Sequence, residues 1–340
     1  MPFKGTLPAS SCFILPTVTT LQRLLATAAS ATAALAASLG AWAAQPLLAP
    51  AELNALLGKP DVRVIDIRPP QAFAQNRIPG ALSAPYGVWR GPASNPGELP
   101  DLAKLTAQVQ KLGLTPATHA VVVSSGDDAT DFGASARVYW TLKVLGLKEL
   151  SVLNGGVDAW AAAKLPQDTA LASVAPSTYV PTVDKSLIAT REDVAALQKS
   201  GSARLVDARP AAFYTGETRH QASLVPGTLK GAVNLEYTRW FAADSSAMLS
   251  ADEVKKIAAD SPANAAAGSD TVSFCNTGHW AAINWFALSE VAGKPGVKMY
   301  PGSMVDWSQS AGAEQAMDNV PGRLGQLVID FKLWAARTFN

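Results

Sequence analysis

The residue best suited to covalent chemistry is Cys275, which begins the segment Cys-Asn-Thr-Gly-His-Trp at residues 275–280. A thiolate is a strong nucleophile and can carry a sulfur atom as a persulfide. The apolar residues 271–274 before it are typical of a buried strand, and residues 281–288 after it are typical of a helix. Cys275 is therefore predicted to lie on a tight loop at the carboxyl end of a strand.

This position favours a reactive sulfur. Ligands bind at the carboxyl ends of the strands in open parallel sheets. Gly278 allows a backbone turn that other residues resist. Such a loop directs amide N–H groups inward, and the N-terminus of the following helix adds partial positive charge. Both are expected to stabilise a thiolate or persulfide anion on Cys275. The alternative is that Cys275 is only a small buried hydrophobic residue.

The five residues after the cysteine are predicted to contact the substrate: Asn276, Thr277, Gly278, His279 and Trp280. His279 could bind an anion as a cation or as a hydrogen-bond donor, or it could be a rim residue packed on Trp280. Thr277 could donate its hydroxyl to the sulfur or only stabilise the turn. Trp280 could form a wall of the pocket or belong to the core.

Composition excludes several other classes of protein. The 28 Lys+Arg and 27 Asp+Glu give no basic face for nucleic acid, and 48% hydrophobic with 16% charged residues excludes a largely disordered chain. Two cysteines, Cys12 and Cys275, cannot make a disulfide framework. His119, His220 and His279 lack the spacing of metal ligands, so neither a metal nor a cofactor is predicted.

The elements that must position the loop occur twice in the sequence. The matched blocks are residues 62–68 and 204–209, 78–82 and 229–233, 121–125 and 271–275, and Gly155 and Trp160 with Gly302 and Trp307. A repeat of about 145 residues indicates a duplicated domain rather than a solenoid. Short β-branched runs that alternate with helical patterns predict an α/β fold, a parallel sheet flanked by helices in each copy.

The two copies differ at the reactive position. Ser125 is matched with Cys275 in the first copy, and Asp127 and Asp128 close behind it would repel an anion. The first copy is therefore predicted to be catalytically inactive. The boundaries are domain 1 at residues 46–165, a Pro/Ser/Thr/Ala-rich linker at 166–187, domain 2 at 188–315 and a tail at 316–340. Thr190 with Asp193 resembles a capping box at the start of a helix in the second copy.

Residues 1–43 have the pattern of a secretory signal. Their only charges are two cations, residues 24–41 are uncharged and apolar, and Ala41-Trp42-Ala43 is a small-residue cleavage pattern. Cleavage predicts a periplasmic or secreted protein with no stable membrane span and with Cys275 as its one thiol. A retained membrane anchor is the alternative, if alanine counts fully as apolar.

These features together resemble the two-domain rhodaneses, a family of sulfurtransferases, over roughly residues 47–315. The resemblance is carried by Asp-x-Arg after the first strand of each copy, by Arg-Ile-Pro-Gly-Ala at 77–81, by Leu-Asn-Gly-Gly-x-x-x-Trp at 153–160 and by the Cys275 loop. It implies two tandem rhodanese-like domains, of which the second is catalytic. It also implies that Cys275 takes a sulfane sulfur from a donor such as thiosulfate and passes it to cyanide or a thiol.

The sequence departs from the family at the donor-binding positions. Members specific for thiosulfate usually have basic loop residues where this chain has Asn276 and Thr277. Members specific for mercaptopyruvate have a loop serine, for which Thr277 is a substitute, a histidine where this chain has Arg77, and an arginine where it has Ala212. Thiosulfate is the default donor, and the resemblance implies no preference beyond it.

Two further arginines outside the loop are candidates for the site. Arg77 is predicted to reach the cleft and bind an anionic donor. Arg209 is a second candidate, although it and Arg68 could instead pair with nearby carboxylates and hold the fold. Arg219 and His220 are expected on the solvated surface.

The cysteine loop also has two other interpretations, of which the second lacks a required residue. A non-catalytic rhodanese-fold sulfur carrier or partner-binding module is the alternative that the unusual loop leaves open. A cysteine phosphatase needs an arginine six residues after the cysteine to bind phosphate, and that position is Ala281. No oligomeric state is predicted.

Overall fold

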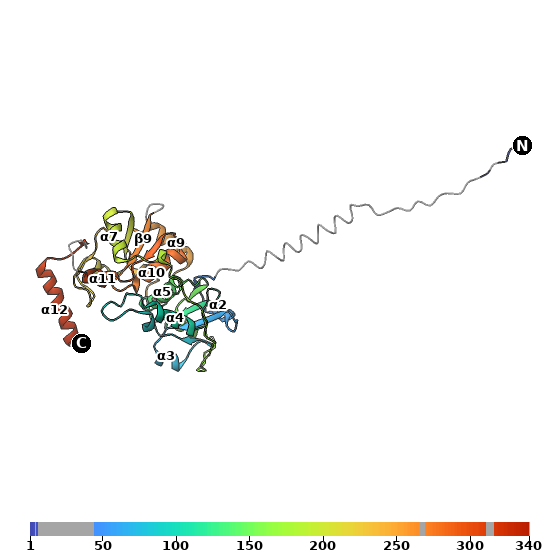
Figure 1. Ribbon diagram of the computed structural model, residues 1–340, viewed down its shortest axis with the longest axis horizontal. Coiled ribbons are helices and arrows are strands. Elements are labelled where there is room, and N and C mark those ends of the chain that lie inside the picture. Colours follow the sequence, from blue (N-terminus) through green and yellow to red (C-terminus); the bar gives the residue numbers. More distant parts are fainter. Residues whose placement is uncertain (4, 6–43, 265–268, 311–315, 340) are drawn as a thin grey trace. The chain divides into compact units, whose positions relative to one another are not determined.

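The computed structural model describes residues 1–3, 5, 44–264, 269–310 and 316–339 (Figure 1). Residues 44–340 form one compact unit that contains both predicted domains. The predicted signal, including Cys12 and the cleavage pattern, lies almost wholly outside the described residues. In the part of the chain that is described, no helix is both long and apolar enough to cross a bilayer.

The first domain contains a five-stranded parallel sheet of order β1-β5-β4-β2-β3. Its strands are β1 (Leu47–Leu48), β2 (Val62–Asp66), β3 (Leu82–Ser83), β4 (His119–Val123) and β5 (Leu150–Leu153). Its helices are α2 (Pro50–Leu56), α3 (Pro70–Gln75), η2 (Tyr86–Trp89), α4 (Leu102–Lys111), α5 (Ala129–Val144) and α6 (Gly156–Ala162). The central strands are buried along most of their length, as expected of a parallel sheet with both faces covered.

The second domain repeats this arrangement with a parallel sheet of order β10-β9-β6-β8. Its strands are β6 (Ala203–Asp207), β8 (Val233–Asn234), β9 (Asp270–Phe274) and β10 (Val297–Met299). Its helices are α7 (Arg191–Ser200), α8 (Ala211–Tyr214), η4 (Tyr237–Trp240), α9 (Ala251–Asp260), α10 (Trp280–Trp285), η5 (Phe286–Val291) and α11 (Ser303–Gln309). The predicted α/β fold with two tandem parallel sheets is confirmed. The helix expected over 281–288 starts as α10 and continues as the π-helical η5.

The matched Asp-x-Arg pairs have the same geometry in both copies. Arg68 Nη2 lies 2.7 Å from Asp66 Oδ2, and Arg209 Nη2 lies 2.6 Å from Asp207 Oδ2. All four side chains are buried. A buried carboxylate needs such a partner because an unpaired charge is costly in the interior. These pairs therefore fix the first turn after the first central strand of each domain.

Sheet register corrects the match at the reactive position by one residue. Asp66 is paired with Val123, and the equivalent Asp207 is paired with Phe274. The residue after each of these is Ser124 in the first domain and Cys275 in the second, so Ser124 rather than Ser125 is the counterpart of Cys275. Neither serine carries a thiol, so the first copy still lacks the reactive group.

The two domains share one hydrophobic core cluster. Helix α5 of the first domain packs against α10 of the second, as Figure 1 shows. Phe132 makes edge-to-face contacts with Phe241 and Phe286. Tyr139 contacts Phe286 in the same way and donates a hydrogen bond to Glu290 Oε2 at 2.7 Å. The loop after β9 thus opens onto a packed domain interface.

The linker and the tail contain short elements of their own. The linker holds η3 (Lys185–Leu187), and Thr190 with Asp193 forms the predicted capping box of α7. In the tail, β11 (Met317–Asp318) pairs antiparallel with β7 (Thr228–Leu229) of the second domain. Helix α12 (Arg323–Phe339) follows and ends the described chain.

Candidate active site

Cys275 lies where the sequence predicts it, directly after β9 and shortly before α10. Its side chain is buried, with the residue 1% exposed, yet it lines a pocket of about 290 Å³. The other lining residues come from both domains: Arg90, Thr130, His220, Asn276, Thr277, His279 and Trp280. The pocket unites a nucleophile with polar groups at the carboxyl end of a parallel sheet, where open α/β proteins bind ligands.

The loop around Cys275 is braced by Ser303 at the start of α11. Ser303 Oγ accepts hydrogen bonds from the amides of Cys275 at 3.0 Å and Gly278 at 3.2 Å, and it donates to Tyr300 O at 2.8 Å. Ser303 has a φ of 55°, in the left-handed region that non-glycine residues seldom adopt. Two of the loop amides therefore point to this hydroxyl rather than to the sulfur, which corrects part of the predicted anion cradle.

Gly278 is required at its position by two independent constraints. Its φ is +66°, and a Cβ there would lie 2.5 Å from Pro301 O and closer still to Arg137 Nη1. The same Arg137 nitrogen donates to Gly278 O at 3.1 Å. Arg137 is fully buried, and desolvation, together with the neighbouring Arg90, lowers its pKa to about 9. A buried cation of the first domain thus holds the loop of the second.

The prediction that His279 binds an anion as a cation is wrong. Its Nε2 lies 2.8 Å from Thr130 O, and because a carbonyl only accepts, Nε2 carries the hydrogen. Its Nδ1 therefore accepts from Tyr86 Oη at 2.8 Å. Desolvation lowers the pKa of His279 to about 4, with Arg90 adding to the effect, so the ring is neutral near pH 7. His279 joins the two domains and has no nitrogen left for a substrate.

Asn276 and Arg209 form a supporting pair. Asn276 is buried, and its Oδ1 accepts from Arg209 Nη1 at 3.3 Å. The rest of the Arg209 guanidinium is bound by Asp207 and by Gly227 O at 2.8 Å. Arg209 is buried and does not line the pocket, so its predicted contact with the substrate is corrected to a positioning one.

Arg77 lies away from the pocket, contrary to the prediction. Its Nε donates to Phe73 O at 3.1 Å and its Nη1 to Ala170 O at 3.3 Å, and the guanidinium sits 4.1 Å from the centre of the Phe73 ring. The linker covers this side chain through backbone pairing between Arg77 and Asp168. With its donors and its aromatic contact provided there, Arg77 is part of the fold rather than of the site.

Thr277 and Trp280 line the pocket as predicted. Trp280 stacks on Tyr237 with 4.9 Å between ring centres and 3° between ring planes, and it meets Phe213 edge to face. The indole therefore forms a rigid wall of the pocket. The backbone carbonyl of Thr277 accepts a hydrogen bond from Arg90 of the first domain at 2.8 Å.

Arg90 is a site residue that the sequence patterns do not indicate. This residue directly follows η2 of the first domain, and its Nη2 donates to Thr277 O at 2.8 Å. Its Nη1 is buried and has no hydrogen-bond partner among the described residues. A buried guanidinium N–H without an acceptor, beside a nucleophile, is suited to binding an anion. No local pattern in the sequence marks Arg90, because only the packing of the domains brings it there.

His220 was predicted on the solvated surface and is instead half-buried in the pocket lining. Its Nδ1 accepts from the amide of Ala222 at 3.1 Å, and burial lowers its pKa. Thr130 also lines the pocket, and no pattern in the sequence marks it. Its backbone carbonyl binds His279, and its hydroxyl lies 2.9 Å from Tyr237 Oη.

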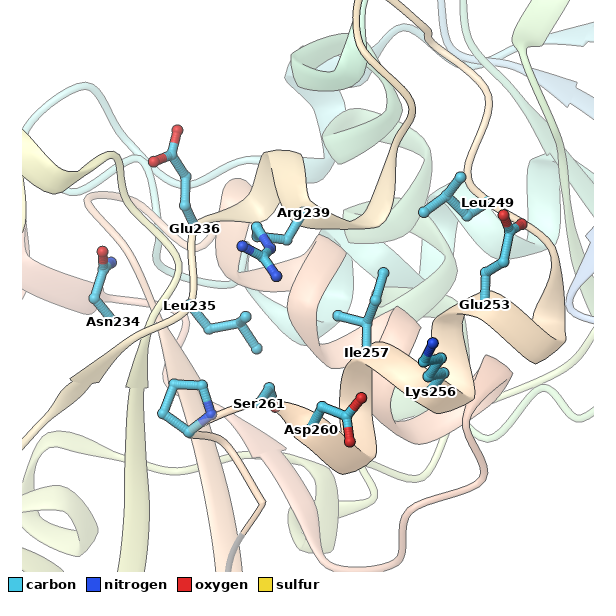
Figure 2. A pocket seen from close by; sticks show the side chains of 11 residues that line it. Asn234, Leu235, Glu236, Arg239, Leu249, Glu253, Lys256, Ile257, Asp260 and Ser261 are labelled. Carbon is cyan, nitrogen blue, oxygen red and sulfur yellow. The ribbon is translucent and has the colours of Figure 1, made fainter.

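One larger cavity lies entirely within the second domain. The cleft between η4 and α9, of about 610 Å³, is shown in Figure 2, where Arg239 extends from η4 toward the space between the two elements. Its charged residues carry both signs: Glu236, Arg239, Glu253, Lys256 and Asp260. No thiol lines it. Within the described ranges, no group of three or more His, Cys, Asp or Glu side chains could hold a metal ion.

Comparison with known proteins assigns the fold and the sequence to one family. The rhodanese-like domain matches this chain twice, over residues 49–163 and 190–310. The chain belongs to the rhodanese family. Among solved structures, this rhodanese is similar to SseA from Escherichia coli, with a TM-score of 0.66 and 21% identity over 76% of this chain and 98% of that one. It is also similar to Tum1 from Saccharomyces cerevisiae, with a TM-score of 0.67 and 21% identity over 82% and 99% of the two chains.

Curated relatives of this rhodanese include enzymes of two names. It is 27% identical to the 3-mercaptopyruvate sulfurtransferase of Rattus norvegicus, over 74% of this chain and 83% of the relative. It is 30% identical to the thiosulfate sulfurtransferase of Gallus gallus, over 71% and 81% of the two chains. Both alignments cover most of each protein, so the two-domain arrangement as a whole is shared.

Proposed function

We propose that this rhodanese is a sulfurtransferase that carries a sulfane sulfur on Cys275. The observation that carries the proposal is a single thiol at a pocket built by both domains, beside an unpartnered guanidinium N–H. The names of the relatives support the reaction class. Ser124 occupies the position equivalent to Cys275, which supports a non-catalytic first domain. That domain contributes Arg90 to the pocket and one side of the domain interface.

The reaction proceeds in two sulfur transfers. The Cys275 thiolate attacks the sulfane sulfur of the donor, the sulfur–sulfur bond forms on the enzyme, and the donor's own bond to that sulfur breaks. With thiosulfate the leaving group is sulfite, which keeps the electron pair of the broken bond. An acceptor such as cyanide then attacks the outer sulfur, leaves as thiocyanate and restores the thiolate. No external oxidant or reductant is needed.

We assign donor binding to Arg90. Thiosulfate and 3-mercaptopyruvate are both anions, and the Cys275 loop itself has no lysine or arginine. Arg90 Nη2 donates a hydrogen bond to Thr277 O, whereas the buried Arg90 Nη1 has no hydrogen-bond acceptor among the described residues. A hydrogen bond from a guanidinium to an anion contributes more binding free energy in a partly desolvated site than at the surface. Arg90 therefore takes the place of the basic loop residues of other family members.

Mass spectrometry tests the carrier step. Incubation with thiosulfate or 3-mercaptopyruvate should add about 32 Da, one sulfur, to the protein, and cyanide or a dithiol should remove it. Cys275→Ser should show neither the added mass nor turnover with any donor. The control is Ser124→Ala, which alters the equivalent position of the first domain and should leave turnover intact. Full sulfur transfer by Cys275→Ser would contradict the proposal.

A sulfur-carrier function is a second candidate. The sulfur carrier protein TtuD of Thermus thermophilus is 29% identical over 75% of this chain and 91% of that protein. A carrier would form the same persulfide but release it only to a specific protein. It would therefore gain about 32 Da from a donor and fail to turn over with cyanide or small thiols. Multiple turnovers with small acceptors would favour the enzyme.

We further propose that residues 1–43 export the protein and are removed. The support is the two-cation start, the uncharged apolar run and the small residues before the cut. N-terminal sequencing of the protein from separated cell fractions tests this. A mature N-terminus near Ala44 in the extracytoplasmic fraction is expected, and an intact N-terminus in the membrane fraction would favour the retained anchor.

A further inference from the structure

Helix α12 touches the second domain through one face only. Ile329 is buried and Leu333 is half-buried on that face. Asp330 forms an ion pair of 2.8 Å with Arg219, which fixes the helix beside the loop that contains His220. The contacts thus hold α12 in place and leave its other side to solvent.

The solvent side of α12 is apolar. Its large exposed side chains are Leu324 (80% exposed), Leu327 (63%), Val328 (54%), Phe331 (64%) and Trp334 (53%). Their spacing of three or four residues places them on one stripe of the helix. No other helix in the described ranges has more than one exposed large apolar side chain. A soluble domain gains nothing from such a stripe, so it indicates an interaction surface.

The charges on α12 decide which partner fits. At 100° per residue, Arg323 and Arg337 lie along one edge of the apolar stripe and Lys332 along the other, and all three are exposed. The one acidic residue of the helix, Asp330, is engaged by Arg219. Cations on both edges of an apolar stripe suit a bilayer surface, where long basic side chains reach anionic headgroups. A second copy of this helix would instead bring cations against cations.

We propose that α12 binds in the plane of a bilayer that contains anionic phospholipid, with the apolar stripe among the acyl chains. The helix has 17 residues and lies on the surface rather than crossing it. Attachment through one such helix is reversible. The proposal is independent of the sulfur chemistry, since none of these residues lines the Cys275 pocket.

Hydrogen exchange on the full chain tests the proposal at the helix itself. Backbone amides at residues 323–338 should exchange more slowly when vesicles of phosphatidylcholine with phosphatidylglycerol are added, and much less so with phosphatidylcholine alone. Because the readout is local, attachment through residues 1–43 does not count as a positive result. The variant Leu327→Glu/Phe331→Glu should lose this protection, and Leu102→Glu on the exposed side of α4 should keep it.

A charge variant separates lipid binding from other causes. Lys332→Gln/Arg337→Gln should raise the lipid concentration needed for protection by roughly 25-fold, about fivefold for each of the two cations. All these variants should retain sulfur transfer, which shows that they are folded. Unchanged exchange on anionic vesicles would overturn the proposal, and so would equal protection by neutral vesicles. Protection that rises with protein concentration without vesicles would assign the stripe to a second copy instead.

Discussion

Arg90 contributes two nitrogens with different tasks to the Cys275 pocket. Nη2 ties the first domain to the carbonyl of Thr277, and Nη1 is left for an anion. Its guanidinium also lies 5.3 Å from the centre of the Tyr86 ring, which restricts its orientation. At the residue scale, the positive charge of the site therefore comes from a preorganised side chain of the other domain.

Replacing Arg90 tests its assignment. Arg90→Gln should lower kcat/KM for anionic donors by roughly 10- to 100-fold, the loss of one charge-assisted hydrogen bond in a sheltered site. Steady-state kinetics with thiosulfate and 3-mercaptopyruvate measure the effect. Arg77→Gln is the matched control, because Arg77 is buried outside the pocket. This substitution should lower the stability of the protein and leave kcat/KM for the sulfur donors unchanged. Unchanged kcat/KM in Arg90→Gln would exclude a donor contact.

The pKa of His279 predicts how stability depends on pH. Its pKa is about 4 in the folded chain and about 6.5 when exposed, so the unfolded chain binds the proton more tightly. Stability from this group is present above pH 6.5 and is lost as the pH falls. The free energy of unfolding should drop by roughly 2 kcal/mol between pH 6.5 and pH 4.5 from this group alone.

Urea denaturation across this pH range checks the His279 prediction. His279→Gln should show a shallower fall, although His220 and His119, whose pKa values burial also lowers, still contribute in both proteins. Identical pH profiles for the two proteins would mean that the histidine is not desolvated in solution.

At the scale of elements, the loop between β9 and α10 needs a residue without a side chain at position 278. Gly278→Ala should destabilise the protein by about 3 kcal/mol or more, since it combines left-handed strain with overlap on Arg137 and Pro301. Sulfur transfer should fall with it, because the overlap displaces Cys275. Thermal unfolding and turnover are the measurements.

Gly231→Ala is the matched control for this change. Gly231 has a similar φ of +75°, with nothing within 4 Å of an added Cβ. Its substitution should cost only about 1 kcal/mol of strain and leave turnover intact. If the two variants behaved alike, steric overlap would not be what excludes alanine at position 278.

Much of this architecture was predictable because it is encoded locally. The hydrophobic runs predict β9 and its repeat β4, and Gly278 and Cys275 predict the loop that follows β9. Such patterns depend only on residues close together in the sequence. The contact of Arg90 with Thr277 joins residues 187 positions apart, and no sequence pattern around Arg90 predicts it. The prediction for Arg77 was wrong for the opposite reason. Its sequence motif correctly marks the family, but the linker residues Asp168 and Ala170 hydrogen-bond to Arg77 and hold it away from the pocket.

At the scale of the molecule, the shared core predicts that both domains unfold together. Calorimetry should show one transition whose calorimetric and van't Hoff enthalpies agree. Phe132→Ala, which removes an aromatic between Phe241 and Phe286, should cost about 3–5 kcal/mol and lower the single midpoint. The control Phe331→Ala, on the exposed stripe of α12, should leave the midpoint in place. Two separate transitions would show that the domains are only loosely joined.

The depth of Cys275 has a consequence for what can meet it. Cys275 is 1% exposed and lines a pocket of about 290 Å³, so a bulky reagent has little room to approach it. We therefore expect small anionic donors to reach Cys275 more readily than folded thiol proteins or large disulfides. Such shielding would protect a persulfide on Cys275 from oxidants between one sulfur transfer and the next.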